Sequence, residues 1–330
     1  MKDVKRLLPG ALISIALIAA LLYFVDFNEM WKAIRTANYP ILAGSAVLSF
    51  VWMFGRAKVW QTLLRDKPKY IDVLFAASEG YLLNSFLPFR LGEIGRAFLL
   101  SRKSGMQFGE IIPTVVIERI VDLAFSAALL LAALPFVVGA QGSERIGYIV
   151  GGVVVFGLVV MYLLARNNQW ALGLFHKFSV RWPSLQRIGG SFLESFFQGL
   201  GVLTDGWLFL RFLFWMTLDW AIALVAYYLI ILAFFPQAQP VWTLFVLGAA
   251  AFGGAIPALP GGVGTVEGAV SAALALFTGD QSTALAAALT MRLYNYLNSG
   301  ILGGIGLMRE GQTLSGVYQQ IMNFRNVERH

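Results

Sequence analysis

Long apolar runs recur along the whole of this 330-residue chain and decide what it can fold into. The sequence is 58% hydrophobic and 13% charged, whereas about a quarter of the residues in a soluble domain are charged. An apolar run of about 18 residues or more crosses a bilayer as a helix, which satisfies its own backbone hydrogen bonds. The sequence therefore predicts an all-α polytopic membrane protein, with almost no length left for a soluble domain.

Six segments have the length and apolar character of membrane spans, and two further segments are apolar but interrupted. The predicted spans are residues 7–25, 39–64, 111–135, 146–165, 207–235 and 283–308. Residues 71–100 and 241–277 each contain an apolar stretch, a break with Pro and Gly, and a shorter apolar stretch. Such broken pairs predict re-entrant hairpins, which are tolerated where protein or a wet cavity covers the freed backbone groups.

Basic residues are distributed unevenly between the loops. The loops after the second and fourth spans, the segment after the first broken pair and the C-terminal tail are rich in Lys and Arg, whereas residues 236–240 and 278–282 have none. The positive-inside rule then predicts both termini in the cytoplasm, the first hairpin entering from the cytoplasmic face and the second from outside. The same bias explains the net charge of +7 better than nucleic-acid binding does.

The remaining segments fit this layout. The first span follows basic residues, as a signal peptide would, but no small-residue cleavage site follows it, so we interpret it as a retained helix. In residues 166–206, aromatic residues alternate with basic and small ones, which predicts interfacial helices on the cytoplasmic leaflet. A surface for a cytoplasmic partner is the alternative interpretation of that segment.

An internal repeat relates the two interrupted segments. LPFRLGEIGRA (87–97) aligns with LPGGVGTVEGA (259–269) at an offset of 172 residues, and RIVD (119–122) aligns with RLYN (292–295) at an offset of 173. If hairpins do not cross the membrane, three crossings separate the starts of the two halves, and the second half is inverted. If each broken pair crosses once, the repeats are parallel, but the loop charges favour inversion. Inverted repeats with paired broken helices are typical of secondary transporters.

The repeat divides one membrane domain into five parts. These are a first helix and outer loop (1–38), a first repeat half (39–135), a connecting span with interfacial helices (136–206), a second repeat half (207–308) and a cytoplasmic tail (309–330). Each half is predicted to be a span, a hairpin and a span.

Three motifs resemble those of a known family. They are N-x-x-x-P-x-R-x-G-E-x-x-R from Asn84 to Arg96, E-R-x-x-D from Glu118 to Asp122, and P-x-x-P-G-G-x-G-x-x-E from Pro257 to Glu267. With them the chain resembles, over nearly its whole length, the flippase-type membrane domain of lysylphosphatidylglycerol synthases and its stand-alone relatives. The resemblance implies translocation of a membrane lipid. The aminoacyl-transferase domain of the fused synthases has no counterpart in these residues, so translocation is expected rather than lipid synthesis.

The first hairpin carries a charged constellation. A charge in the hydrocarbon region costs roughly 2.5–3.5 kcal/mol on insertion scales, so such residues are usually paired or face a cavity. Arg90, Glu93 and Arg96 lie at i, i+3 and i+6, within a broad stripe of a short helix that begins near Pro88. Two guanidiniums beside a helix N-terminus predict a phosphate-binding site. The alternative is structural: Glu93 neutralises an arginine and the cluster only fixes the hairpin.

The following span adds a second charged group. Glu118 and Asp122 lie at i and i+4 on one helix face, with Arg119 beside them. These acids either form salt bridges to Arg90 or Arg96, or relay protons. The sequence leaves both interpretations open.

In the second half, Arg292 aligns with Arg119, but Asn295 replaces the acid. Arg292 is therefore expected to pair with Glu267 or, less favoured, to contact the substrate. Gly261 and Gly262 either pack closely at the hairpin tip or expose a helix N-terminus to a headgroup, and a nucleotide loop is excluded because no strand precedes them. The residues expected to shape the two breaks are Asn84, Pro88, Gly92, Pro257, Pro260 and Gly264.

The function predicted from these patterns is a flippase or transporter of an anionic or phosphate-bearing lipid. The chain has no cysteine, two isolated histidines and no nucleotide-hydrolysing P-loop, so no enzyme activity, metal or cofactor is expected. Transport would then use an ion or lipid gradient, with Glu93, Glu118, Asp122 and Glu267 as candidates for proton coupling. Two alternatives remain open: a non-transporting scaffold whose partner is a lipid-synthesis enzyme, and an intramembrane lipid transferase.

Overall fold

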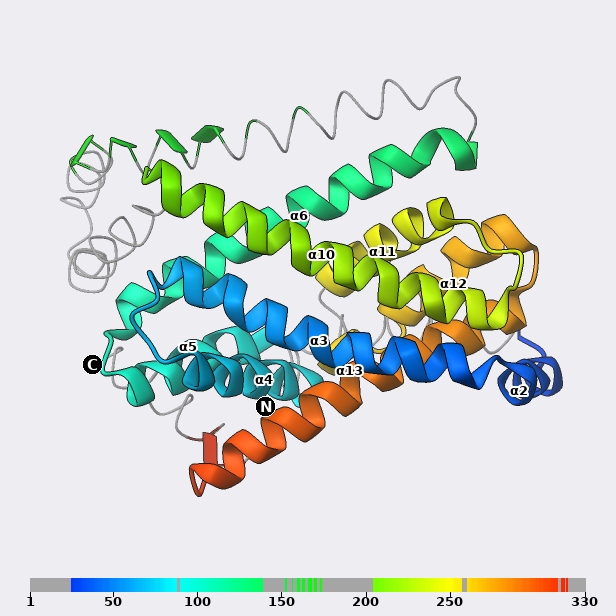
Figure 1. The fold of residues 1–330 in the computed structure, drawn as a ribbon, viewed down its shortest axis with the longest axis horizontal. Helices are drawn as coiled ribbons and strands as arrows, with labels where there is room; N and C mark the ends of the chain where they lie inside the picture. The colour runs from blue at the N-terminus through cyan, green and yellow to red at the C-terminus, as the bar shows by residue number, and fades with distance from the viewer. Residues whose placement is uncertain are drawn as a thin grey trace, which may run out of the picture.

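The computed structural model describes residues 25–87, 90–138, 204–256 and 260–313, with scattered positions at 152–173 and 316–319. Across these residues the regular structure is helical (Figure 1). The helices are α2 (Phe27–Thr36), α3 (Tyr39–Leu63), α4 (Tyr70–Phe86), α5 (Leu91–Ser104), α6 (Phe108–Val138), α10 (Gly206–Phe234), α11 (Pro240–Ala255), the 3-10 helix η3 (Pro260–Gly262), α12 (Thr265–Thr278) and α13 (Gln281–Arg309).

Three of these helices, α3, α6 and α10, are long and apolar enough to cross a membrane. They coincide with three of the predicted spans. The span predicted at 283–308 lies within α13, a helix of 29 residues that falls short of the same apolar character because Arg292, Asn295 and Asn298 interrupt it. The predicted spans 7–25 and 146–165 and the interfacial segment 166–206 lie wholly or mostly outside the described residues.

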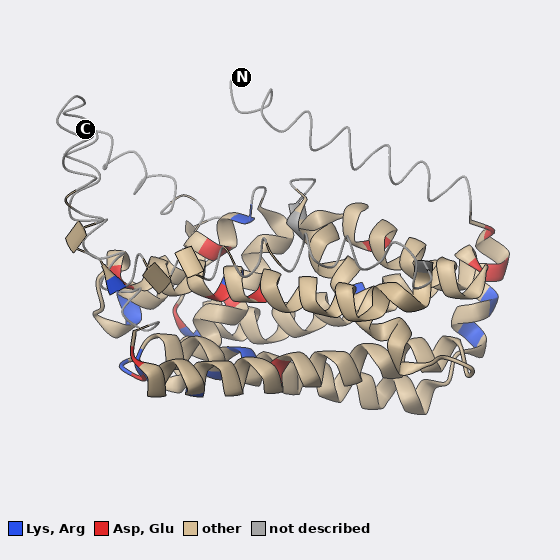
Figure 2. Cartoon of the chain, turned by 90° about the horizontal axis from the view of Figure 1, so that it is seen from above, with Lys and Arg blue, Asp and Glu red and all other residues tan. Residues whose placement is uncertain are grey.

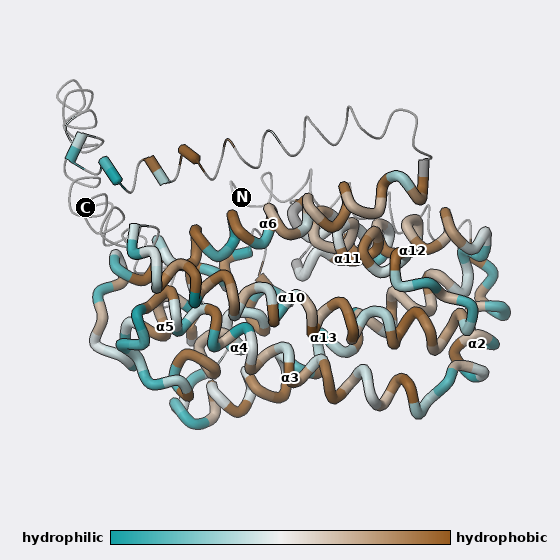
Figure 3. The backbone as a smooth tube through the Cα atoms, turned by 45° about the horizontal axis from the view of Figure 1, so that its top comes forward, coloured by the Kyte–Doolittle hydropathy of each residue, from teal (hydrophilic) through white to brown (hydrophobic). Residues whose placement is uncertain are grey.

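The long helices consist largely of hydrophobic residues (Figure 3), and several large apolar side chains on them face outward. Phe136, Trp207 and Phe214 are 68%, 77% and 61% exposed. Large apolar side chains that face outward along helices of this length are suited to contact with lipid tails rather than with water.

Helices α3 and α10 cross as an antiparallel pair near the middle of the molecule (Figure 1). The backbone N–H of Asn38 donates to the carbonyl of Ala233 at 3.0 Å, and the hydroxyl of Ser45 donates to the carbonyl of Ala226 at 2.8 Å. Residue numbers thus rise along α3 as they fall along α10. The C-terminal ends of the two helices therefore lie at opposite ends of the molecule.

Each of these helices leads into a helical hairpin, α4–α5 after α3 and α11–α12 after α10. Glycines allow the hairpin arms to pack closely. A Cβ on Gly92 would lie 2.1 Å from the carbonyl oxygen of Gly80, and one on Gly253 would lie 2.7 Å from that of Thr265. Because α3 and α10 are antiparallel, the hairpins start from opposite ends and their tips approach each other in the middle.

The last helix of each half packs on the hairpin of the other half: α13 lies along α4, and α6 lies along α11. A Cβ on Gly303 of α13 would lie 2.8 Å from the carbonyl oxygen of Ser78, and one on Gly248 of α11 would lie 2.5 Å from Cγ of Leu130 on α6. The internal repeat relates these two contacts to each other. The offset of 172 residues relates Ser78 to a position within a few residues of Gly248, and Leu130 to one within a few residues of Gly303.

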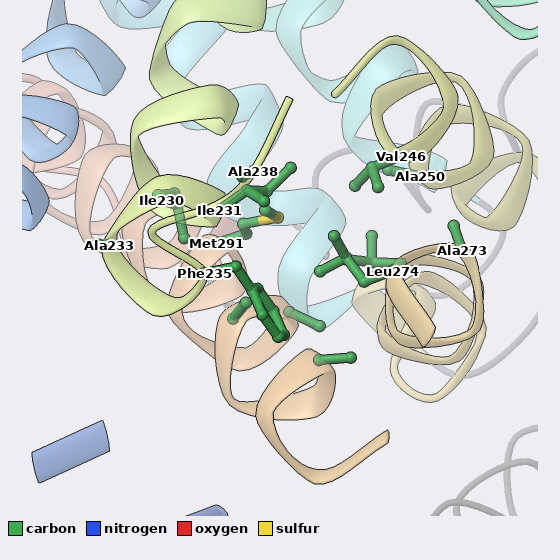
Figure 4. Close-up of a cluster of buried hydrophobic side chains, with 14 of the residues drawn as sticks. Ile230, Ile231, Ala233, Phe235, Ala238, Val246, Ala250, Ala273, Leu274 and Met291 are labelled. Atoms are coloured by element: carbon green, nitrogen blue, oxygen red, sulfur yellow. The ribbon is translucent and has the colours of Figure 1, made fainter. Parts of the chain in front are cut away.

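Four clusters of buried apolar side chains hold this arrangement together. In the largest, shown in Figure 4, Ile231 of α10 and Met291 of α13 lie beside Val246 of α11 and Leu274 of α12. This cluster fixes the second hairpin against the last helix and so positions the hairpin tip.

Charged residues lie in the middle of the helix bundle and at its two ends (Figure 2). We call one of them the basic end: there α3, α5 and α13 finish and α4, α6 and α10 begin. It carries Arg65, Lys67, Lys69, Arg102, Lys103 and Arg309. The opposite end holds α2, where Lys32 and Arg35 are balanced by Asp26 and Glu29.

Candidate functional site

A cavity of about 470 Å³ lies where the two hairpin tips meet. It is bounded by side chains from α3, α4, α5, α6, α10, α11 and α13 and from both tips. Its described charged lining residues are Arg56, Arg90, Glu93, Arg119 and Arg292. Four cations and one anion therefore face a space in the middle of an otherwise apolar bundle.

Arg90 lies at the tip of the first hairpin, immediately before α5. Its backbone has φ 53° and ψ 36°, a left-handed conformation that costs of order 1–3 kcal/mol for a residue with a side chain. The second hairpin uses glycines, Gly261 and Gly262, at its own left-handed positions. A glycine would adopt this conformation at lower cost, so the arginine at this position indicates a need for its side chain rather than for the turn alone.

The guanidinium of Arg90 donates a hydrogen bond to the carbonyl oxygen of Gly254 near the end of α11. Among the described residues, no carboxylate lies within ion-pair distance of it. Arg90 thus bridges the two hairpin tips through a neutral acceptor and differs in this from the other lining arginines.

Arg56, in the middle of α3, is the centre of a buried ion-pair network. Its guanidinium lies 2.9 Å from Asp122 on α6 and 2.9 Å from Asp219 on α10, and 3.5 Å from Glu118. The indole N–H of Trp220 also donates to Asp122, at 3.2 Å. Three helices from both halves therefore meet at one guanidinium.

Arg119 joins this network to the first hairpin. Its guanidinium lies 3.3 Å from Asp122 and 3.7 Å from Glu93 and contacts Glu118, and it donates to the hydroxyl of Tyr81 at 3.2 Å. Arg119 lines the cavity, whereas Glu118 and Asp122 do not. Glu118 and Asp122 therefore neutralise Arg119 from behind, away from the open space, whereas Glu93 lines the cavity beside it.

Arg96, which was predicted with Arg90 to form a phosphate-binding site, is not among the described residues that line the cavity. Arg96 is 2% exposed and lies between Glu93 at 2.9 Å and Glu118 at 3.2 Å, with its guanidinium 4.5 Å from the ring of Trp60. The i, i+6 spacing does not place Arg90 and Arg96 on one helix face, because α5 begins at Leu91 and Arg90 precedes it. Arg96 instead fixes the hairpin against α6.

Comparison with known proteins identifies the family of this chain. The family described as Lysylphosphatidylglycerol synthase TM region matches residues 10–303. The chain belongs to this family. It is therefore an integral, multi-pass membrane protein.

Archaeal members named as UPF0104 membrane proteins are similar to the chain. One from Methanocaldococcus jannaschii is 27% identical over 223 residues, covering 68% of this chain and 92% of the relative. A second from that organism is 22% identical and one from Methanothermobacter thermautotrophicus is 23% identical; they cover 90% and 92% of this chain and 93% of each relative. No solved structure matches the sequence.

The second hairpin of this family member holds Arg292 in a comparable way. Nε of Arg292 lies 3.0 Å from Glu267, its guanidinium donates to the carbonyl of Gly261, and it lies 4.9 Å from the ring centre of Tyr296. Glu267 also accepts the N–H of Gly264 at 2.8 Å, which caps α12. Arg292 pairs with Glu267, as the sequence favoured, and it lines the cavity too.

The residues predicted to shape the breaks lie at the two tips. Asn84 donates to Glu93 at 3.3 Å and lines the cavity, and Gly92 packs against α4. Gly261 and Gly262 line the cavity with φ of 73° and 65°. Pro260 begins η3, while Pro88 and Pro257 lie outside the described residues.

Neither Arg56 nor Asp219 was predicted from the sequence as a site residue. A signal for Arg56 was present, because a guanidinium in the middle of an apolar span needs a partner or a cavity. The described lining also contains aromatic rings and neutral polar groups. These are Trp52, Tyr81, Trp220, Tyr227 and Tyr296, with Ser49, Asn84, Ser85, Asn295 and Ser299.

Proposed function

We propose that this protein moves an anionic, phosphate-bearing lipid across the cytoplasmic membrane without ATP hydrolysis. The observation that carries the proposal is the arrangement of charge around the cavity: four arginines line it with one carboxylate, Glu93, and the other carboxylates that pair with these arginines lie behind them. The carboxylates offset the cost of burying guanidiniums from the protein side. The N–H groups of each guanidinium that face the cavity then remain to donate hydrogen bonds to a lipid headgroup.

Arg90 is the proposed primary contact for the phosphate. Its described polar partner is a neutral backbone carbonyl at the tip of the other hairpin. A phosphate carries a negative charge and can accept two parallel hydrogen bonds from one guanidinium, which the single uncharged carbonyl of Gly254 cannot do. A headgroup in the cavity would therefore compete successfully with Gly254 for this guanidinium.

The architecture that we propose for the membrane is an inverted repeat of six spanning helices with two re-entrant hairpins. It is supported by the antiparallel crossing of α3 and α10 and by hairpins that start from opposite ends. Paired broken helices that meet near the midplane are how secondary transporters build a substrate site. The cavity between the tips corresponds to that position.

The orientation that we propose places the basic end in the cytoplasm. Excess Lys and Arg mark cytoplasmic loops, and the α2 end has as many acidic as basic residues among Asp26, Glu29, Lys32 and Arg35. Both termini are then proposed to be cytoplasmic, because α13 ends at the basic end and the sequence predicts one further span, 7–25, before α2.

We infer that the protein is a transporter rather than a transferase. An intramembrane enzyme needs an activated nucleophile, a metal or a general base at its reacting centre. The described cavity lining instead offers guanidiniums, hydroxyls, amides and one carboxylate held by arginines. These groups bind and orient an anion. Glu93, Glu118 and Asp122 connect three arginines into one network, so proton uptake there is the proposed means of coupling.

The test is lipid movement by the purified protein in liposomes that contain a trace of phosphatidylglycerol with a fluorescent acyl chain. A membrane-impermeant quencher added outside reaches only the outer leaflet, so fluorescence lost beyond that fraction reports movement. We expect the loss to rise in proportion to the protein-to-lipid ratio. A loss equal to that of protein-free liposomes would reject transport and favour the scaffold hypothesis.

A further inference from the structure

The face of α13 that borders the cavity is mostly uncharged. Arg292, Asn295, Tyr296 and Ser299 lie at i, i+3, i+4 and i+7, so they lie on one side of the helix, and all four line the cavity. Of these four residues, only Arg292 carries a charge. Across the cavity, α3, α4 and α10 add Ser49, Ser85 and Tyr227 to the neutral polar groups.

Hydroxyl and amide groups both donate and accept hydrogen bonds, and so they match a ligand that carries hydroxyls. The cavity volume of about 470 Å³ is within the usual range for small-molecule sites. It can hold more than a phosphate group. A neutral, hydrogen-bonding substituent on the phosphate would find partners on this wall, whereas the phosphate would lie toward Arg90.

Among its described lining residues, the cavity offers no free carboxylate to a cation. Glu93, the one acid among the described lining residues, has a side chain that is 15% exposed and lies 2.9 Å from Arg96 and 3.7 Å from Arg119. Glu267 and Asp219 do not line the cavity, and they form ion pairs with Arg292 and Arg56 respectively. An ammonium group in this space would meet guanidiniums at close range in a poorly screened environment, which is unfavourable.

Resting on the proposed function, we propose that the substrate headgroup is a phosphodiester with an uncharged, hydroxyl-bearing substituent, such as glycerol or a sugar, and that headgroups with an ammonium are rejected. Rejection by like charge is a common source of specificity. The family takes its description from lysylphosphatidylglycerol synthases. A lysyl headgroup carries ammonium groups, so this chain selects against it.

The experiment compares three lipids with the same fluorescent acyl chain in proteoliposomes: phosphatidylglycerol, phosphatidylethanolamine and lysylphosphatidylglycerol. We expect the protein-dependent rate for phosphatidylglycerol to be at least tenfold higher than for either ammonium-bearing lipid. The informative variant is Asn295→Asp, which places a carboxylate on the neutral wall at the position equivalent to Asp122 of the first half. This variant should lower the ratio of the phosphatidylglycerol rate to the phosphatidylethanolamine rate, because it raises the movement of phosphatidylethanolamine relative to that of phosphatidylglycerol.

The matched control is Asn28→Asp, the same change on the exposed outer helix α2, which should leave the ratio unchanged. Equal rates for all three lipids in the native protein would overturn this inference and leave the proposed function standing. An unchanged ratio in Asn295→Asp would also overturn it, because the wall would then not set the selection. If no lipid moved faster than in protein-free liposomes, the proposed function would fail and this inference with it.

Discussion

The guanidinium of Arg56 in α3 lies 2.9 Å from the carboxylate of Asp219 in α10, and this ion pair joins the two halves near their crossing. Asp219 is fully buried, and Arg56 is 4% exposed. Removing one partner of such a pair leaves an uncompensated buried charge, which typically costs 3–5 kcal/mol. The pair therefore makes the association of the halves depend on Arg56.

We expect Arg56→Leu to lower the free energy of unfolding by about 3–5 kcal/mol, because Asp219 and Asp122 lose their shared cation. Thermal unfolding of the detergent-solubilised protein measures the effect. Adding Asp219→Asn to the variant should recover part of the loss. Lys32→Ala, which removes an exposed contact of 3.9 Å with Glu29, is the control and should change stability by less than about 1 kcal/mol.

A second buried carboxylate depends on a lysine at the basic end. Lys103 at the end of α5 lies 2.9 Å from Glu79 of α4, which is fully buried, and also contacts Glu310 after α13. Lys103→Met should destabilise the protein by about 3–5 kcal/mol, since two carboxylates then face each other without a cation. The double variant with Glu79→Gln should be more stable than Lys103→Met alone. An equal or lower melting temperature for the double variant would contradict this account.

Stability at the basic end should depend on pH through Asp66, in the turn between α3 and α4. Partial burial raises the pKa of Asp66, but hydrogen bonds and charge attraction from Lys58 and Arg211 outweigh it and lower the pKa below its usual value. A lowered folded-state pKa gives stability that is present above the unfolded-state pKa, about 3.9, and is lost as the pH falls through the folded-state pKa.

Asp66→Asn should therefore lower the melting temperature at pH 7, and by less at pH 3. The effect should be modest, because the side chain is 34% exposed and solvent screens it. The measurement is the difference in melting temperature between the native protein and the variant at each pH. A difference that stays the same at both values would show that the charge of Asp66 is not responsible.

The orientation can be tested with single cysteines, because the native chain contains none. We expect cysteines at Lys67 and Ser104, at the basic end, to react with an impermeant maleimide only after the cell membrane is opened. Cysteines at Asn28 and Gln237, at the opposite end, should react in intact cells. Labelling of position 67 or 104 in intact cells would reject the proposed cytoplasmic orientation.

Much of the fold follows from local sequence patterns. Continuous apolar runs located α3, α6 and α10, and the breaks at Pro88 and Pro260 located the two hairpins, because both features depend on residues close together in the chain. Aligned short motifs also indicated which segments correspond. The span predicted at 283–308 is less clear, since α13 exposes polar groups to the cavity.

The ion-pair partners could not be predicted in the same way. Arg56 and Asp219 lie far apart in the sequence, and only the antiparallel crossing of α3 and α10 brings them together. The different roles of Arg90 and Arg96 depend on where α5 begins, a boundary that sequence patterns locate poorly. The pairing of Arg292 with Glu267 was more accessible, because the repeat alignment singles out Arg292 and the motif from Pro257 to Glu267 ends on the acid.

The central claim is that Arg90 binds the lipid phosphate, whereas Arg96 holds the hairpin in place. The most direct measurement is paired: phosphatidylglycerol movement in liposomes and melting temperature, on the same preparations of Arg90→Ala and Arg96→Ala. Losing a charge-assisted bond costs roughly 1.5–3 kcal/mol, about tenfold or more in affinity. Arg90→Ala should therefore lose at least about nine-tenths of the transport rate with a near-native melting temperature, while Arg96→Ala should melt several degrees lower. Native transport by a folded Arg90→Ala protein would contradict the account.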